Sequence, residues 1–313
     1  MSISNEIERL QQAKKDIGDA IVRKGGSVSG TLDTYAKSVM ALGDVSFRAA
    51  IDIVNKSDAK NVDLTMISPR NETDLSLLFF KNDKLVSIDV SNWDTSKVTK
   101  FKQTFSLMHN LETVDLSKWD TSKVINFFAM FDEVYKIKVL DVSKWNTSSA
   151  ENMDWMFCRC SSITTFDVSK WNTSNVENMA HMFMACSSLT TLDLSGFDTS
   201  KVTTMMSMFN GCSSLTTLDL SGFDASKVTT MMSMFLNNIK LSEVKCDGMK
   251  LPNIELNNIN LNKSPLSVDS IVGLLNALQK SDKEYSFQIG ADNIAKLTDE
   301  QKAIATDKGW TLI

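Results

Sequence analysis

A repeat of 26 residues runs through most of the amino-acid sequence, and it limits the possible folds more than any other feature. Each unit has an aspartate, followed 16 residues later by a phenylalanine. The aspartates are Asp89, Asp115, Asp141, Asp167, Asp193 and Asp219, and the phenylalanines are Phe105, Phe131, Phe157, Phe183, Phe209 and Phe235. A degenerate unit with Asp63 and Phe79 precedes them, and Lys245 takes the aspartate position after them. A fixed period of roughly 20 to 50 residues predicts a solenoid, whose coils bury their apolar faces against each other.

One unit, residues 215–235, shows what each coil is expected to form. Leu218 and Leu220 alternate with polar residues, which predicts a half-buried strand. Asp224 then offers a helix N-cap. Apolar residues follow at helical spacing, at Val228, Met231, Met234 and Phe235. The predicted fold class is therefore an α/β solenoid of strand-turn-helix coils.

The surplus of methionine and phenylalanine follows from this repeat. The chain holds 17 Met and 16 Phe, and many of them recur in the helical stripe that should face the sheet. An aromatic column four residues after the aspartate has the same phase as the buried Leu and Val: Trp93, Trp119, Trp145, Trp171, Phe197 and Phe223. Cys160, Cys186 and Cys212 form a further column, while Cys158 and Cys246 lie outside it. We expect buried, reduced thiols, since parallel stacking gives poor disulfide geometry.

The amino-acid sequence of the repeat also resembles that of a known family. Residues 167–189, DVSKWNTSNVENMAHMFMACSSL, are similar to the leucine-rich repeat of BspA-like surface proteins and of mycoplasma lipoproteins. The resemblance covers residues 63 to about 250. It implies a leucine-rich-repeat solenoid used for adhesion and for binding protein or glycan, without catalysis. Members on bacterial surfaces usually carry a signal sequence, and this chain shows none at its start.

The sequence outside the repeat predicts an additional unit at each end. Residues 1–44 are expected to form a helical hairpin, and residues 45–62 a lead-in strand before the solenoid of residues 63–262. Residues 263–313 are expected to form an α+β cap that continues the sheet, with a helix over 267–278, a strand over 285–289, a capping box at Thr298 and a final strand over 310–313. The wording of residues 6–21 and 31–36 is similar to leaders of tail and baseplate-region proteins of gut bacteriophages. The C-terminal wording resembles the module that follows such repeats in phage and gut-bacterial relatives.

Several classes of function are disfavoured by the sequence. A formal net charge of −5 argues against a nucleic-acid binder. No apolar run reaches the roughly 18 residues of a membrane span, and no signal peptide is evident, so we expect folding in a cytoplasm. Catalytic motifs are missing, and His109 and His181 occupy different offsets in their coils and are not expected to meet. The chain is therefore expected to be no enzyme and to need no cofactor.

The aspartate column is the sharpest candidate for a metal site. Six carboxylates at strand spacing repel one another, and a row of calcium ions would offset that repulsion. The alternative is local: Lys118, Lys144 and Lys170, with nearby Ser and Thr donors, neutralise and hydrogen-bond the row. We favour the local account, since the coils lack glycine-rich calcium loops, and predict no metal. A large fall in melting temperature on adding EDTA would overturn that choice.

The outward residues of the strands form the candidate binding surface. Parallel stacking should present them as flat polar ladders, which suit recognition of protein or glycan but would equally serve as a plain solvated face. The candidate ladder comprises Thr113, Asp115, Ser117, Lys118, Asp141, Lys144, Thr165, Asp167, Ser169, Lys170, Thr191, Asp193, Ser195, Thr217, Asp219 and Ser221.

Three hypotheses for function remain open at this point. The first is a phage virion protein whose N-terminal helices contact other virion proteins and whose repeats meet a host-surface protein or glycan. The second is a bacterial cell-surface adhesin whose signal peptide is absent here, and the third is an intracellular protein-binding scaffold. The heptad-like leader adds the prediction of a homo-oligomer.

Overall fold

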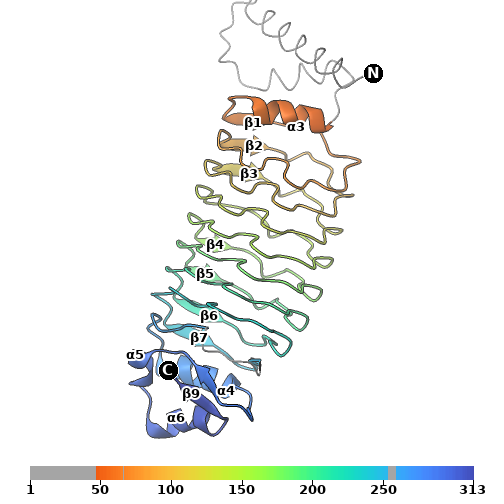
Figure 1. The fold of residues 1–313 in the computed structure, drawn as a ribbon. Coiled ribbons are helices and arrows are strands. Elements are labelled where there is room, and N and C mark those ends of the chain that lie inside the picture. The colour runs from red at the N-terminus through yellow and green to blue at the C-terminus, as the bar shows by residue number, and fades with distance from the viewer. Residues whose placement is uncertain (1–46, 66, 253–258) are drawn as a thin grey trace, which may run out of the picture.

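The chain folds into a solenoid whose coils stack along one axis, as the repeat predicts (Figure 1). The computed structural model describes residues 47–65, 67–252 and 259–313. The helical hairpin expected over 1–44 lies outside these residues. Along one side of the stack run the parallel strands β1 (Asn61–Asp63), β2 (Ser87–Asp89), β3 (Thr113–Asp115), β4 (Thr165–Phe166), β5 (Thr191–Leu192), β6 (Thr217–Asp219) and β7 (Glu243–Lys245).

The register between coils is 26 residues at every pairing, so equivalent positions stack directly. Asp63 pairs with Asp89, Asp89 with Asp115, and Asp219 with Lys245, which confirms the degenerate first unit and the Lys245 replacement. Isolated parallel bridges form a second column from Asp74 to Thr230. The strand side is divided into β1–β2–β3, β4–β5 and β6–β7, and the coil at 137–141 has no strand.

The prediction of a helix in each coil is wrong. In its place each coil has a turn segment in which alternate N–H groups bond to the next coil, as Gln103 N–H does to Phe128 C=O at 2.8 Å. The residues between them close local turns, as Thr104 N–H does on Phe101 C=O at 3.2 Å. A helix is about 10 Å wide, whereas paired strands hold successive coils about 4.8 Å apart, so one helix per coil would not fit flat against this stack.

Two columns of left-handed residues make this turn segment possible. The first comprises Leu77, Gln103, Ala129, Trp155, His181, Ser207 and Ser233, and the second comprises Lys81, Leu107, Glu133, Arg159, Ala185, Gly211 and Asn237. All but Gly211 carry a Cβ at positive φ, a conformation that costs roughly 1 kcal/mol each. The inter-coil hydrogen bonds and the packed core must therefore hold these residues in place.

We predict that Gly211→Ala destabilises the protein by about 1 kcal/mol, because alanine is disfavoured at the Gly211 φ of +76°. The nearest atom to an added Cβ is Ala185 Cα at 3.4 Å, so the cost comes from the backbone and not from a severe clash. Urea unfolding measures the change. The reverse substitution in the same column, Ala185→Gly at φ +56°, serves as the control and should not destabilise. Equal losses in both variants would contradict the prediction.

The interior consists of stacked columns of identical residue types, as the composition suggested. Phe79, Phe105, Phe131, Phe157, Phe183, Phe209 and Phe235 form one column with ring centroids 5.4 to 6.1 Å apart. The tryptophan column is buried as predicted, and Trp93, Trp119 and Trp171 donate their indole N–H to backbone carbonyls. Buried Met130, Met156, Met182, Met208 and Met234 fill the space beside the phenylalanines.

Asp224 is not a helix N-cap. Its Oδ1 accepts the N–H of Ser226 at 3.0 Å in an Asx turn, and its backbone forms a parallel bridge with Lys250. The same turn recurs at Asp94, Asp120, Asn146, Asn172 and Asp198. An aspartate side chain stabilises a turn in the same way as it caps a helix, so the sequence alone does not distinguish the two.

The lead-in strand predicted over 45–62 is mostly wrong, because residues Phe47–Lys56 form helix α3. Ala50, Ile51 and Val54 are buried, and Phe47 packs edge-on against Trp93 at 5.1 Å. These four residues follow the spacing i, i+3, i+4 and i+7 of an amphipathic helix, and this period prevails over the local apolar run. α3 lies against the first coil beside β1 (Figure 1).

The C-terminal elements lie close to their predicted positions. They are α4 (Val268–Ala277, capped by Ser267), β8 (Tyr285–Phe287), α6 (Asp299–Thr306, with the capping box of Thr298 and Gln301) and β9 (Trp310–Leu312). The short helix α5 (Ala291–Ile294) was not expected. β8 and β9 pair only with each other and do not continue the solenoid sheet within the described residues. Beside β7 the next position is taken by α4, whose Ser270 Oγ accepts the Val244 N–H at 2.8 Å.

Candidate functional site

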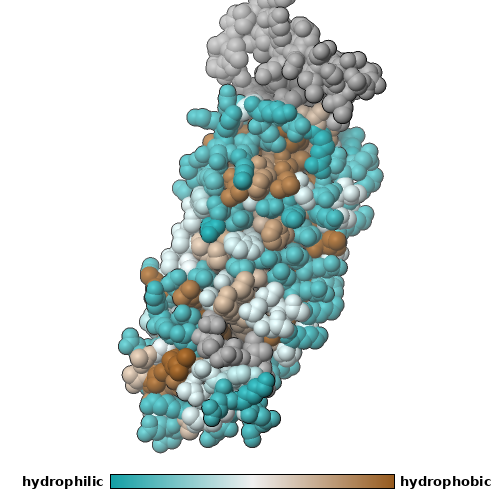
Figure 2. All heavy atoms as spheres, in the orientation of Figure 1, coloured by the Kyte–Doolittle hydropathy of each residue, from teal (hydrophilic) through white to brown (hydrophobic). Residues whose placement is uncertain are grey.

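The structure places the threonines and aspartates of the predicted ladder along the strand side, and its serines and lysines in the turns that follow. In β4 and β6 the apolar residues Phe166 and Leu218 point into the core, while Thr165, Thr217 and Asp219 are exposed on the outside. Thr165 pairs with Thr191 in the next coil. On the face of the molecule seen in Figure 2, hydrophilic residues cover most of the surface, with smaller apolar patches among them.

Serine hydrogen bonds hold every aspartate of the row in place. Asp115, Asp141 and Asp193 each accept, through Oδ1, the N–H of the serine two residues later, at 2.9 to 3.1 Å. The same bond occurs at Asp89, Asp167 and Asp219. These hydrogen bonds lower the carboxyl pKa of Asp115, Asp141, Asp193 and Asp219.

Lysine adds a smaller effect in the middle coils. Lys118 and Lys144 lower the pKa of Asp115 further, after the Ser117 hydrogen bonds. The neighbouring Asp115 acts in the opposite direction on Asp141, as expected for stacked carboxylates. The local account of the aspartate row thus has serine as its main component. Among residues 47–65, 67–252 and 259–313 no group of three or more His, Cys, Asp or Glu is arranged to hold a metal ion.

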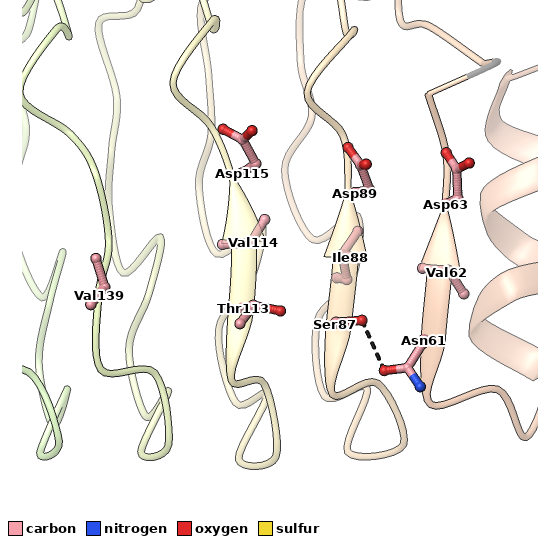
Figure 3. A pocket seen from close by; sticks show the side chains of 10 residues that line it. All are labelled: Asn61, Val62, Asp63, Ser87, Ile88, Asp89, Thr113, Val114, Asp115 and Val139. Carbon is pink, nitrogen blue, oxygen red and sulfur yellow. Dashed lines mark hydrogen bonds between the residues drawn. The ribbon is translucent and has the colours of Figure 1, made fainter.

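The strand face is hollowed at its N-terminal end. A depression of about 540 Å³ lies over β1, β2 and β3 and reaches Val139 in the next coil (Figure 3). Asp63, Asp89 and Asp115 line one side of it, and Asn61, Ser87 and Thr113 line the other. Sequence reasoning missed this depression, although the Val in a column of Ser and Thr was a visible signal at position 139.

The cysteines are buried, as predicted. Cys160, Cys186 and Cys212 donate S–H to the carbonyls of Phe131, Phe157 and Phe183 at 3.1 to 3.2 Å. Burial raises the pKa of Cys212 to about 12, so its thiolate is not accessible near neutral pH. All five cysteines are free and buried.

The two histidines lie in separate clusters on the turn side of the coils. His109 Nδ1 is 2.9 Å from Asp83 Oδ1, and its Nε2 is 3.3 Å from Glu133 Oε2. Glu133 also accepts hydrogen bonds from Tyr135 and Arg159. These contacts link neighbouring coils through residues that do not belong to the repeat consensus, so the repeat did not predict them.

The second histidine cluster lies further along the same side. His181 Nδ1 is 3.2 Å from Asp154 Oδ1, and the imidazole stacks on Trp155 with centroids 4.2 Å apart. His109 and His181 thus have different partners, in line with the expectation that they would not meet.

Asp132 is the one carboxyl in this region whose pKa is strongly raised. Its Oδ1 is buried without a hydrogen-bond partner, and burial raises the pKa to about 6. The Glu133 carboxylate acts in the same direction, whereas Cys158 and Arg159 lower the pKa. Unfolded aspartate titrates near pH 3.9, so the folded protein loses stability as the pH rises from about 4 to about 6.

We predict that Asp132→Asn stabilises the protein at neutral pH by about 1 kcal/mol, a value reduced for screening by water. Urea unfolding at about pH 4 and about pH 7.5 measures the gain, which should appear only at the higher pH. Asp193→Asn is the control of opposite sign, because the pKa of Asp193 is lowered and its ionised form is stabilising. A gain for Asp132→Asn that is the same at both pH values would contradict the prediction.

Comparison with family models identifies the family of the chain. The model described as "Mycoplasma protein of unknown function, DUF285" matches residues 73–166 and 152–249, together more than half of the chain. The chain belongs to this family. The match covers the repeats of the solenoid, and the family description assigns no activity.

Other comparisons give weaker similarities. No curated protein matches. A leucine-rich repeat protein from Bacteroides ovatus is 14% identical, with coverage of 74% of this chain and 69% of that one and a TM-score of 0.26. The functional domain of InlJ from Listeria monocytogenes, described as including a cysteine ladder, is 13% identical, with coverage of 74% and 67% and a TM-score of 0.22. In the described residues of this DUF285 member, no helix has both the length and the apolar character needed to cross a membrane.

Proposed function

We propose that the chain is a non-enzymatic binding protein that presents its strand face to a host-surface protein or glycan. The observation that carries the proposal is the repeated polar strand face: Thr113, Thr165, Thr191 and Thr217 and the aspartates from Asp89 to Asp219 are exposed at multiples of 26 residues. A rigid, repeated polar array suits recognition of an extended partner, and the buried stacked columns beneath keep it flat. The Ser hydrogen bonds to each Asp fix the side chains before a partner arrives.

We propose further that the chain is part of a bacteriophage virion, and that its N-terminal region contacts other virion proteins. The similarity of residues 6–21 and 31–36 to phage tail and baseplate leaders supports it. Genomic neighbours encoding phage structural proteins are the expected result. Neighbours encoding metabolic or secretion functions would overturn the virion assignment, and an in-frame signal sequence upstream would favour the bacterial cell-surface adhesin instead.

Adhesion is tested with cell-binding and glycan-array assays. Thr165→Arg and Thr191→Arg place bulky charge on adjacent coils of the strand face, and we expect them to abolish binding. Thr203→Arg is the control and should leave binding intact, because Thr203 is exposed beside the second column of parallel bridges and not on the strand face. Equal binding by all three variants would place the binding surface elsewhere. We expect no binding to nucleic acid, given the net charge of −5, and no catalytic turnover.

A further inference from the structure

The depression over β1, β2 and β3 differs in chemistry from the rest of the strand face. Its ionisable lining residues are Asp63, Asp89 and Asp115, and no lysine or arginine lines it. Three carboxylates in direct register lie along one side at the strand spacing of about 4.8 Å. The depression therefore has a concentrated negative potential inside a chain whose net charge is only −5.

The lysine column covers only the middle coils and does not reach Asp89. Lys118, Lys144 and Lys170 stand three residues after their aspartates, but Asn92 stands three residues after Asp89. Within the described part of the chain, Asp89 and Asp115 form no salt bridge, although Lys118 lowers the pKa of Asp115. Each carboxylate uses Oδ1 for its Asx turn, as in Asp89 with Ser91 and Asp115 with Ser117. That bond orients the carboxylate without neutralising it.

An apolar patch completes the depression. Val139 is 77% exposed in a column where Ser87, Thr113 and Thr165 stand in other coils. Val114 on the floor is only partly buried, whereas the equivalent Ile88 is 2% exposed. An exposed valine beside a row of carboxylates matches a ligand group with an aliphatic stem and a cationic head.

We propose that this depression binds a segment of a partner protein that presents lysine or arginine side chains, with the ammonium or guanidinium groups on the aspartate row and the stems against Val139. The proposal rests on the proposed function, because it names the chemistry of the partner for the same face. A neutral glycan would bring no positive charge to Asp89 and Asp115, and an acidic glycan would be repelled by them. An extended basic segment lying along the solenoid axis offsets the repulsion within the row.

The test uses a fluorescein-labelled hexapeptide of alternating lysine and valine, with an alternating glutamate and valine peptide of equal length for comparison. Fluorescence anisotropy with the full chain should show binding of the lysine peptide alone, weakening as salt is added. Asp89→Asn and Asp115→Asn keep an oxygen for the Asx turn and remove the charge, and each should raise the dissociation constant about fivefold. Val139→Thr, which restores the residue type of the other coils, should raise it about threefold.

Matched controls lie on the same face outside the depression. Asp193→Asn and Asp219→Asn have the same Asx turns and should leave the dissociation constant unchanged. A loss of affinity at these positions equal to the loss at Asp89 would overturn the inference. Binding that needs a divalent cation and is abolished by EDTA would also overturn it, because it would indicate a metal site. If the host surface binds through Thr165 and Thr191 while the lysine peptide does not bind, the inference fails and the proposed function stands.

Discussion

Phe157→Ala is expected to lower the free energy of unfolding by about 4 kcal/mol, the largest effect of any single substitution considered for this chain. The Phe157 ring is fully buried in the middle of the phenylalanine column. It stacks between Phe131 at 5.8 Å and Phe183 at 5.7 Å, and it also contacts Phe166 at 4.4 Å. Truncation leaves a cavity between two coils whose spacing is fixed by backbone hydrogen bonds, so the stack cannot collapse to fill it.

Urea unfolding followed by tryptophan fluorescence measures this loss. Phe157→Leu keeps most of the volume and should cost about 1 kcal/mol, which separates the cavity from the loss of the aromatic contacts. A loss below about 1 kcal/mol for Phe157→Ala would show that the phenylalanine column is not the main source of cohesion between coils.

Thr173→Val is expected to cost about 2 to 3 kcal/mol, although it removes only a hydroxyl group. Thr173 Oγ1 donates to Asp198 C=O at 2.9 Å and accepts Asp198 N–H at 2.8 Å, both from the next coil. The side chain is fully buried. Valine has the same shape but leaves both backbone groups of Asp198 without this partner.

The same urea experiment tests this substitution. Thr217→Val is the control, because Thr217 is exposed on β6, where valine suits a strand, and the change should stay within about 0.5 kcal/mol. If Thr173→Val and Thr217→Val prove equally mild, water must replace the hydroxyl between the coils. Thr95, Thr121, Thr147 and Thr199 make the equivalent bond to the next coil.

The repeat was sufficient to predict the arrangement of the chain along the solenoid axis. Because Asp63 and Phe79 matched the later units, the sequence located a first coil, and the pairing of Asp63 with Asp89 confirms it. The direction of the side chains within the strand also followed from alternation, which placed Thr165 outside and Phe166 inside. Stacking of identical positions then follows from the fixed period alone.

The path of the backbone within one coil was not predictable in the same way. Met231, Met234 and Phe235 are buried, and their spacing fits a helix as well as the turn segment that the chain adopts. The spacing between coils decides between the two, together with the left-handed conformation of residues such as Gln103 and Leu107. That conformation cannot be predicted from these residue types, because non-glycine residues rarely adopt it. The buried threonines that bond to the next coil, Thr95, Thr121, Thr147, Thr173 and Thr199, also escaped notice, because threonine is equally common on an exposed strand.

The candidate site was predicted only where it repeats. The Thr and Asp columns were identified from their period, but the depression at Val139 and the cluster of His109 with Glu133 consist of residues that depart from the consensus. Such departures are visible in the sequence, yet which of them meet depends on positions in neighbouring coils that only the three-dimensional register fixes.

The inter-coil hydrogen bonds of the turn segment carry a consequence for how chains of this kind change length. Each coil offers its successor the same set of donors and acceptors, as Phe105 N–H does toward Met130 C=O and Phe131 N–H toward Met156 C=O. Excising residues 167–192 would therefore join two compatible faces, whereas removing half of that segment would set every later donor against the wrong acceptor. The coils are structurally equivalent, so unequal recombination between repeats would shorten or lengthen the solenoid by whole coils and leave both terminal regions unchanged.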